Sequence, residues 1–161
     1  MKVYYSKPKK TNLSIAKSDF YKLVNEIIKC IKLNLSKELA ASVNFVDSKT
    51  ICRINLDYVG HKGITDVISF NYLTDADLLS SSDIFAELFI CIEKAETESH
   101  DRLIDFSEEL TLYIVHGLLH IAGFDDLKAS ERKQMRNAEA SCMKLLKNKF
   151  KLNEIFTLKN S

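Results

Sequence analysis

The chain is poor in the residues that separate domains and interrupt regular structure. Its 161 residues include only four glycines and one proline, Pro8, and no stretch is rich in Pro, Gly and Ser together. We therefore expect one domain over residues 1–150, followed by a short basic tail over residues 151–161. Because 46% of the residues are hydrophobic, a sizeable core can be buried, which excludes global disorder.

Long apolar runs are also missing. No stretch approaches the roughly 18 to 20 consecutive apolar residues that a membrane helix needs, and residues 1–14 lack the apolar segment of a secretory signal. We therefore expect a cytoplasmic protein with no membrane partner.

Closely spaced cysteines are absent as well. The four cysteines lie far apart, form no Cys-x-x-Cys pair, and each falls in an apolar segment: Cys30, Cys52, Cys91 and Cys142. This pattern is typical of small core residues in a reducing compartment, and it argues against a zinc or redox site built on thiols.

Arginine is scarce, and charge is unevenly distributed. Nineteen lysines stand against four arginines, which disfavours bidentate, arginine-based recognition of phosphate. The net charge is +1, but residues 1–37 and 142–161 are basic whereas residues 38–141 are acidic. The basic ends have two interpretations: contacts with a phosphate backbone, or solvated helix faces and a frayed tail.

Hydrophobic periodicity predicts a mixture of strands and helices. Strands are expected over residues 2–5, 40–46, 66–72 and 86–93, and helices from Ser18 onward, over 48–58, near Ala95, over 107–122 and over 130–149. Ser18 is the expected N-cap of the first helix, and Asp105 with Glu108 the expected capping box of the helix over 107–122. That helix is apolar on nearly every side and should be central. The mixture indicates an α/β or α+β protein in which helices cover a small sheet.

The stretch HGLLHIAGFDDL, residues 116–127, carries the candidate chemistry. His116 and His120 are four residues apart, so both rings lie on one face of a helix and can converge on one ion. Gly123 can adopt a left-handed conformation and end the helix, which allows the chain to turn back and bring Asp126 to the histidine pair. The spacing H-x-x-x-H-x-x-G-x-x-D is that of the metzincin zinc proteases, with aspartate in place of the third histidine.

Two histidines and one carboxylate form a known catalytic zinc set, with a fourth position open to water. The alternative is that both histidines are satisfied core residues and the aspartates cap a turn. A peptidase of this type carries glutamate directly after the first histidine as its general base. Here that residue is Gly117, so the pattern disfavours peptide hydrolysis.

The same residues resemble the signature of the YbeY family of metal-dependent endoribonucleases, H-G-x-L-H-x-x-G-[YF]-D-H, and depart from it only at Asp126. A second block, INLDYVGHKGITDVISF over residues 54–70, is similar to the family's L-N-x-x-Y-R-x-K-D-x-P-T-D-V-L-S-F in register and without a gap. Flanking matches are Glu109-Leu110 and the series Glu131, Met135 and Glu139. The resemblance covers roughly residues 40–145.

The resemblance implies an α+β fold with a small mixed four-stranded sheet covered by helices, and a metal site at the C-terminal end of the central helix. It implies a metal-dependent endoribonuclease that cleaves single-stranded RNA in ribosomal RNA maturation and ribosome quality control. One zinc ion per chain is expected, held by His116, His120 and Asp126, with Asp125 a turn residue or a support of the ligands. The implied partners are precursor ribosomal RNA and the small ribosomal subunit; a monomer is favoured.

Three departures limit this expectation. Asp126 replaces a histidine ligand, which changes metal affinity and preference. The family's arginine falls on Val59, and we expect His61 and Lys62 to substitute for it, giving a catalytic set of His116, His120, His61 and Lys62. A Gly-Asp pair that opens a later strand in the family is replaced by residues 86–87, Ala-Glu.

Three alternatives stay open at this point. The first is a ribosome-associated metal-binding factor with little or no nuclease activity. The second is a metalloprotease that takes its base from elsewhere in the chain. The third is a purely structural metal site closed by His61.

Overall fold

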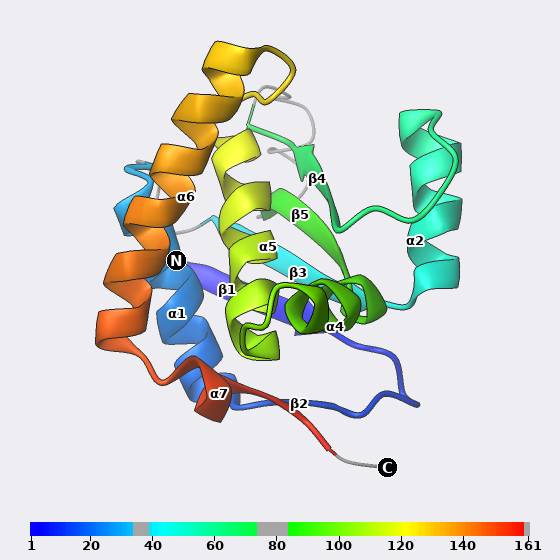
Figure 1. Ribbon diagram of the computed structural model, residues 1–161, viewed down its shortest axis with the longest axis vertical. Helices are drawn as coiled ribbons and strands as arrows, with labels where there is room; N and C mark the ends of the chain where they lie inside the picture. The colour runs from blue at the N-terminus through cyan, green and yellow to red at the C-terminus, as the bar shows by residue number, and fades with distance from the viewer. Residues whose placement is uncertain (34–38, 74–83, 160–161) are drawn as a thin grey trace.

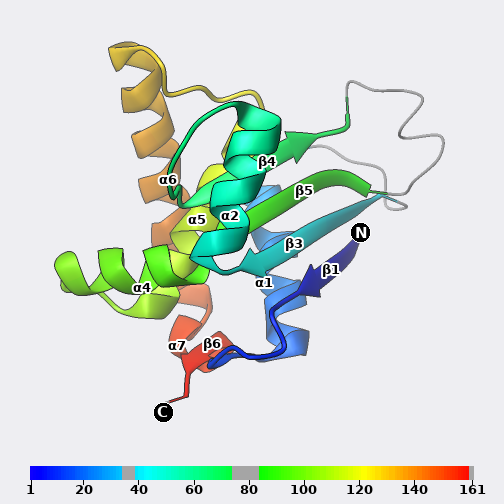
Figure 2. The same ribbon diagram turned by 90° about the vertical axis from the view of Figure 1, so that its right-hand side faces the viewer.

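The computed structural model describes residues 1–33, 39–73 and 84–159. In this part of the chain, a mixed four-stranded sheet has the order β1-β3-β5-β4 (Figures 1 and 2). The first three of these strands are parallel, and β4 runs antiparallel to β5. Their bounds are β1 Lys2–Ser6, β3 Ala40–Val46, β4 Val67–Asn71 and β5 Ile84–Cys91. The expected α+β class and the four-stranded mixed sheet are therefore confirmed.

Helices cover both faces of the sheet, as Figure 2 shows. On one face lie α1 (Lys17–Cys30), α5 (Phe106–Ile121) and α6 (Ala129–Lys149). On the other face α2 (Ser48–Ile54) packs through a small apolar cluster that includes Ile51, Ile68 and Cys91. α4 (Ile92–Asp101) follows β5 directly and packs against α5. Among the helices of the described residues, none combines the length and apolar character that crossing a bilayer requires.

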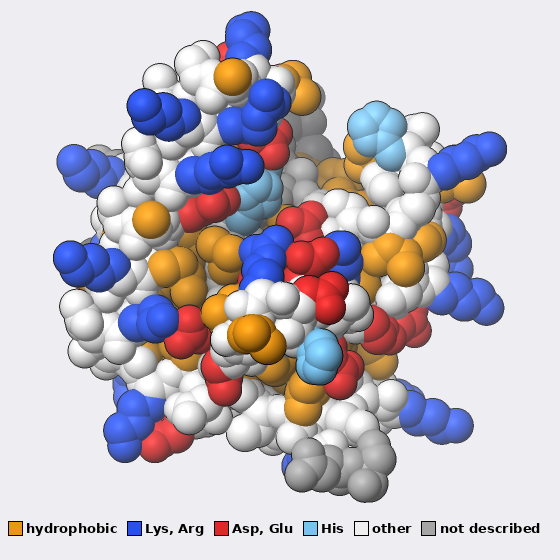
Figure 3. Space-filling view, viewed as in Figure 1, with side chains coloured by type: hydrophobic (Ala, Val, Ile, Leu, Met, Phe, Trp, Pro, Cys, Tyr) orange, Lys and Arg blue, Asp and Glu red, His pale blue; other side chains and the backbone are white. Residues whose placement is uncertain are grey.

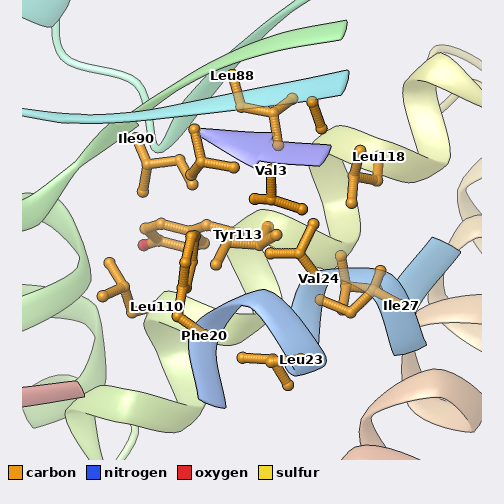
Figure 4. Packing of buried hydrophobic residues seen from close by; sticks show 14 of the residues in the cluster. Val3, Phe20, Leu23, Val24, Ile27, Leu88, Ile90, Leu110, Tyr113 and Leu118 are labelled. Carbon is orange, nitrogen blue, oxygen red and sulfur yellow. The ribbon is translucent and has the colours of Figure 1, made fainter. Parts of the chain in front are cut away.

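α5 is the central helix, as its apolar character predicted. Its side chains Leu110, Tyr113 and Leu118 lie in the same cluster as Phe20 of α1 and Leu88 of β5, and Figure 4 shows them converging between the helices and the sheet. All of these side chains are nearly or completely buried. Since α5 is sandwiched between the sheet and α6, its C-terminal end is held rigidly, and that end carries the histidine pair.

Gly117 is the point of closest approach between α5 and the sheet. A Cβ atom at this position would lie 2.9 Å from Leu88 Cδ2, 2.9 Å from Ser69 Oγ and 3.1 Å from Val67 Cγ2. These atoms belong to side chains of β4 and β5, so any side chain at residue 117 would have to displace them or move the helix away from the sheet. The position after the first histidine therefore has no room for the glutamate of a zinc protease.

Replacing Gly117 with alanine is expected to lower the free energy of unfolding by roughly 1 kcal/mol, and by about 2 kcal/mol at most. Overpacking a core costs about 1 to 3 kcal/mol, of which alanine recovers only about 1 kcal/mol through its better helix propensity. Urea unfolding followed by circular dichroism measures the change. Asn137→Ala, on the exposed face of α6, is the control and should cause no loss. An unchanged urea midpoint for Gly117→Ala would contradict this prediction, since it would mean that the side chains of β4 and β5 make room for the methyl group.

The first helix begins differently from the prediction. α1 starts at Lys17 with Ala16 as its N-cap and without a side-chain cap, so Ser18 is not the N-cap. The reason lies in strand pairing: β2 (Leu13–Ile15) pairs with β6 (Phe156–Leu158), and the N–H of Ala16 donates to the carbonyl of Ile155 at 2.9 Å. The strand therefore leads directly into the helix and fixes its first turn.

Residues 152–158 do not form the frayed basic tail that the sequence suggested. α7 (Leu152–Ile155) and β6 pack into the main core, and the Phe156 ring lies edge-on to Phe20 and Phe45 at centroid distances of 5.8 and 6.0 Å. Residues 160–161 lie outside the described part of the chain. The cause is that Leu152, Ile155 and Phe156 are apolar residues between Lys151 and Lys159, and the core buries them.

Two further helix ends refine the prediction. Asp105 is the N-cap of α5 and accepts from the N–H of Ser107 at 2.8 Å, but the Glu108 carboxylate accepts from Lys147 Nζ instead of completing a capping box. The helix expected over residues 48–58 divides into α2 and a π-helical segment η1 (Asn55–Val59). All four cysteines are free and buried or half-buried, as expected of core residues.

Candidate metal centre

The C-terminal end of α5 is shaped by Gly123. Its φ of 90° is in the left-handed region, where glycine is favoured. The N–H of Gly123 donates to the carbonyl of His120, and the N–H of Phe124 donates to that of Leu119, both at 3.0 Å. This pair of bonds is a Schellman motif. It reverses the chain directly after the histidines, as the sequence predicted.

The two histidine rings face each other through their Nε2 atoms. The distance between His116 Nε2 and His120 Nε2 is 3.0 Å. Each Nδ1 has a separate partner: that of His116 lies 2.6 Å from Glu139 Oε1, and that of His120 lies 3.1 Å from the carbonyl oxygen of Phe124. Both rings are therefore fixed in orientation from behind, which is how proteins commonly hold metal-binding histidines.

This arrangement fits a cation between the rings. A carbonyl oxygen only accepts, so His120 Nδ1 carries the proton, and His116 Nδ1 donates in the same way to the Glu139 carboxylate. The Nε2 atoms of two neutral rings then direct lone pairs at each other and repel unless a positive charge lies between them. Two nitrogens on one tetrahedral zinc ion lie roughly 3.3 Å apart, a few tenths of an ångström beyond the spacing found here.

Asp126 completes the cluster. Its carboxylate and the ligand atoms of His116 and His120 all lie within 4.8 Å of one another, and all three residues are partly buried. The convergence expected from the spacing is thus present, and these three residues could hold a metal ion. The loop that carries Asp126 is fixed by Arg132 of α6, whose Nη1 donates to the carbonyls of Asp126 and Leu127 at 3.0 and 2.6 Å. The carboxylate of Asp125 accepts from the N–H of Asp126 at 2.7 Å, as a turn residue does.

The charges around His116 favour a cation. Burial lowers the pKa of the His116 imidazole, but the hydrogen bond to Glu139 and the nearby carboxylates of Asp66 and Asp126 outweigh it, so the pKa is raised above its ordinary value. The same negative potential attracts a metal ion.

Two clefts meet at the cluster. The α6 cleft, about 450 Å³, is lined by Asp66, Arg102, Leu112, Tyr113, His116, Asp126, Arg132, Met135, Arg136 and Glu139. The β4 cleft, about 460 Å³, is lined by Asn55, Val59, His61, Thr65, Asp66, Val67, Ile68, Ser69, His116, His120 and Asp126. Asp66, His116 and Asp126 line both. The cluster is therefore accessible from two sides.

The loop after η1 forms one wall of the β4 cleft. The side chain of Asn55 is buried and donates from Nδ2 to the carbonyl of Gly63 at 3.1 Å, while the N–H of His61 donates to the carbonyl of Asn55 at 3.2 Å. His61 is exposed and lines this cleft, whereas Lys62 is exposed but lines neither cleft. His61 is also not part of the ligand cluster, so the described residues give no support to a closed structural site with His61 as fourth ligand.

Glu87, at one of the departures from the family pattern, is not in either cleft. Its carboxylate accepts hydrogen bonds from Asn44 Nδ2 at 3.0 Å and from the Tyr72 hydroxyl at 3.2 Å, and the neighbouring Ala86 is completely buried. This departure therefore lies outside the residues that line the two clefts.

Sequence reasoning missed the contribution of α6. Glu131, Met135 and Glu139 lie four residues apart on one face of this helix: Glu131 caps its first turn, Met135 is buried at 1% exposure, and Glu139 holds His116. Arg132 and Arg136 sit beside them in the cleft. The spacing was visible in the sequence, but the pairing of Glu139 with His116 depends on how α6 folds back along α5.

Comparisons with known proteins agree with this geometry. The model of the family described as Endoribonuclease YbeY matches residues 5–147. The Endoribonuclease YbeY of Protochlamydia amoebophila is 42% identical over 106 residues, which cover 66% of this chain and 69% of that protein. The Endoribonuclease YbeY of Syntrophomonas wolfei is 35% identical over 131 residues, which cover 78% of this chain and 83% of that protein.

A solved structure supports the fold. The solution structure of TM1509 from Thermotoga maritima superposes with a TM-score of 0.61, covering 94% of this chain and 93% of that one, at 19% sequence identity. At this level of identity the similarity concerns the fold alone.

Proposed function

The chain belongs to the Endoribonuclease YbeY family, and on this premise we propose that it is a metal-dependent endoribonuclease that cleaves single-stranded RNA during ribosomal RNA maturation and ribosome quality control. Its proposed partners are precursor ribosomal RNA and the small ribosomal subunit, and it acts as a monomer. The family relationship supports the class of reaction, and the metal cluster supports the place at which the reaction occurs.

One observation carries the proposal: the three convergent ligand atoms lie where two clefts meet. A single zinc ion held by His116, His120 and Asp126 would supply a Lewis acid and a bound water of lowered pKa. An RNA strand can approach from the α6 cleft and leave through the β4 cleft, so its phosphodiester passes next to the cluster. Glu139 and the carbonyl of Phe124 keep both imidazoles in the tautomer that leaves Nε2 free to bind.

The rim of the β4 cleft favours unpaired RNA. Val59 lines this cleft and is 44% exposed, and Tyr58 and Ile64, next in the chain to the lining residues Val59 and Thr65, are 73% and 53% exposed. The Tyr58 ring is held edge-on against Phe70 at 5.7 Å. Exposed rings and apolar side chains next to a cleft can stack on bases only when the bases are unpaired. The departure at Val59 thus exchanges a cation for an apolar contact. We propose that His61 contacts an RNA phosphate at this rim, and that Lys62 contacts a phosphate farther along the RNA strand.

The test is cleavage of a labelled single-stranded RNA by the purified chain, with zinc and with EDTA, beside the same sequence in a perfect duplex. We expect internal cleavage of the single strand with zinc, almost none with EDTA, and much slower cleavage of the duplex. RNA binding without cleavage at any metal concentration would favour the ribosome-associated, non-catalytic alternative. Equal cleavage with EDTA would contradict the role of the metal.

A further inference from the structure

The fold gathers the scarce arginines beside the metal cluster. Three of the four arginines in the chain, Arg102, Arg132 and Arg136, line the α6 cleft. Figure 3 looks onto this side of the molecule, where Lys and Arg side chains gather over α6 beside a recessed histidine with acidic neighbours. The low arginine content argued against bidentate, arginine-based recognition of phosphate by the chain as a whole. Their concentration in one cleft reverses that argument for this site.

Arg102 is already engaged in ion pairs within the protein. Its guanidinium lies 3.0 Å from the carboxylate of Glu98 and 3.2 Å from that of Glu109, and Glu109 is completely buried. Since a buried carboxylate depends on its counter-charge, Arg102 has a structural task. It shapes the cleft wall rather than offering a free charge.

Arg132 uses part of its guanidinium for hydrogen bonds within the protein. Its Nη1 is occupied by the carbonyls of Asp126 and Leu127, which fixes the loop that carries the third ligand. A guanidinium has five N–H donors, so the rest of this group can still donate into the cleft. Removing Arg132 would disturb the metal cluster as well as any ligand contact.

Arg136 is the available cation. It lies one turn after Arg132 on α6, is exposed, and lines the same cleft as His116 and Asp126. Within residues 1–33, 39–73 and 84–159, no hydrogen bond or ion pair engages its guanidinium. An unpaired guanidinium at the rim of a cleft is suited to bind phosphate oxygens through two parallel hydrogen bonds.

We propose that Arg136, assisted by Arg132, binds the RNA phosphate that flanks the scissile bond on the α6 side of the metal cluster. The inference rests on the proposed function and adds to it a substrate-positioning residue. The cleft volume of about 450 Å³ is in the range of roughly 300 to 1,000 Å³ that is typical of small-ligand sites. Arg136 thereby supplies from α6 a phosphate contact that the β4 side, with Val59, lacks.

The test compares Arg136→Gln with Lys133→Gln, which removes the same charge one turn earlier on α6 at an exposed position outside both clefts. Affinity for a fluorescent 12-nucleotide single-stranded RNA is measured by anisotropy over a series of salt concentrations, with EDTA present to prevent cleavage. Arg136→Gln is expected to weaken binding roughly tenfold, the effect of one charged hydrogen-bonding contact. Its slope of log Kd against log salt should fall by about 0.7, the value for one phosphate on a single strand.

The remaining variants separate the possible failures. Lys133→Gln should change affinity by less than about twofold, and Arg136→Lys should keep the wild-type salt slope while losing part of the affinity. Zinc content, measured by mass spectrometry, should be equal in all of them. If wild type binds RNA but Arg136→Gln binds as tightly as Lys133→Gln, the inference is wrong and the proposed function stands. If wild type binds no RNA, both are overturned.

Discussion

Replacing Asp126 with alanine is expected to remove the metal from the protein and to lower the rate of RNA cleavage at least a thousandfold. Two histidines alone leave an incomplete set, since catalytic zinc sites use three protein ligands. A metal ion contributes several kcal/mol of transition-state stabilisation, and about 4 kcal/mol corresponds to a thousandfold in rate. Metal content is measured by mass spectrometry of the purified protein, and cleavage is measured with labelled single-stranded RNA.

Two further variants make this prediction specific. Asp126→His restores the residue that the family signature has at this position, and it should keep about one zinc ion per chain together with most of the cleavage activity. Asp125→Ala removes the neighbouring carboxylate, which is exposed and, within the described part of the chain, bonded only to the N–H of Asp126. This variant should keep its metal. If Asp126→Ala retains zinc, Asp126 is not the third ligand and the cluster must be completed in another way.

Glu139→Ala is expected to lower zinc affinity by roughly 10- to 100-fold, the usual effect of losing the carboxylate behind a metal-binding histidine. The carboxylate lies 2.6 Å from His116 Nδ1, and both side chains are mostly buried. Without it, the His116 ring can rotate, and its Nε2 becomes a poorer ligand. Competition with a fluorescent zinc chelator measures the affinity.

Matched variants separate the loss of the hydrogen bond from the loss of charge. Glu139→Gln keeps an oxygen that can accept from His116 Nδ1, so its loss of affinity should be smaller than that of Glu139→Ala. Glu131→Gln removes a carboxylate eight residues earlier on the same helix, where it caps the first turn. It should leave zinc affinity unchanged. Equal affinities for Glu139→Ala and Glu131→Gln would contradict the orienting role of Glu139.

The parts of the site that were predictable from the sequence are local along the chain. The i, i+4 spacing of His116 and His120, the helix-ending Gly123 and the return to Asp126 all depend on backbone geometry within eleven residues. The sequence also showed that Gly117 stands where a zinc protease has its glutamate base. Helix and strand periodicity likewise located the central helix and the four strands of the main sheet to within about two residues of their observed ends.

The parts that were missed depend on contacts between distant segments. Glu139 meets His116 across 23 residues because α6 folds back along α5. β2 and β6 are three-residue strands from opposite ends of the chain, too short for periodicity to reveal, and their pairing displaced the predicted cap of α1. The α6 cleft is of the same kind. Its arginines belong to α6 and to the turn between α4 and α5, and only the tertiary fold brings them together.

The meeting of the two clefts at the cluster has a consequence for how the cleavage point on an RNA is chosen. A nuclease that trims from an end needs a wall against which that end can stop, so that the reactive atoms act at a fixed number of nucleotides from it. Here the cluster opens on both sides, toward α6 and toward β4. The site therefore offers no fixed distance from a terminus. Under the proposed function, the position of the cut would be set by which stretch of an RNA is unpaired and which partner presents it.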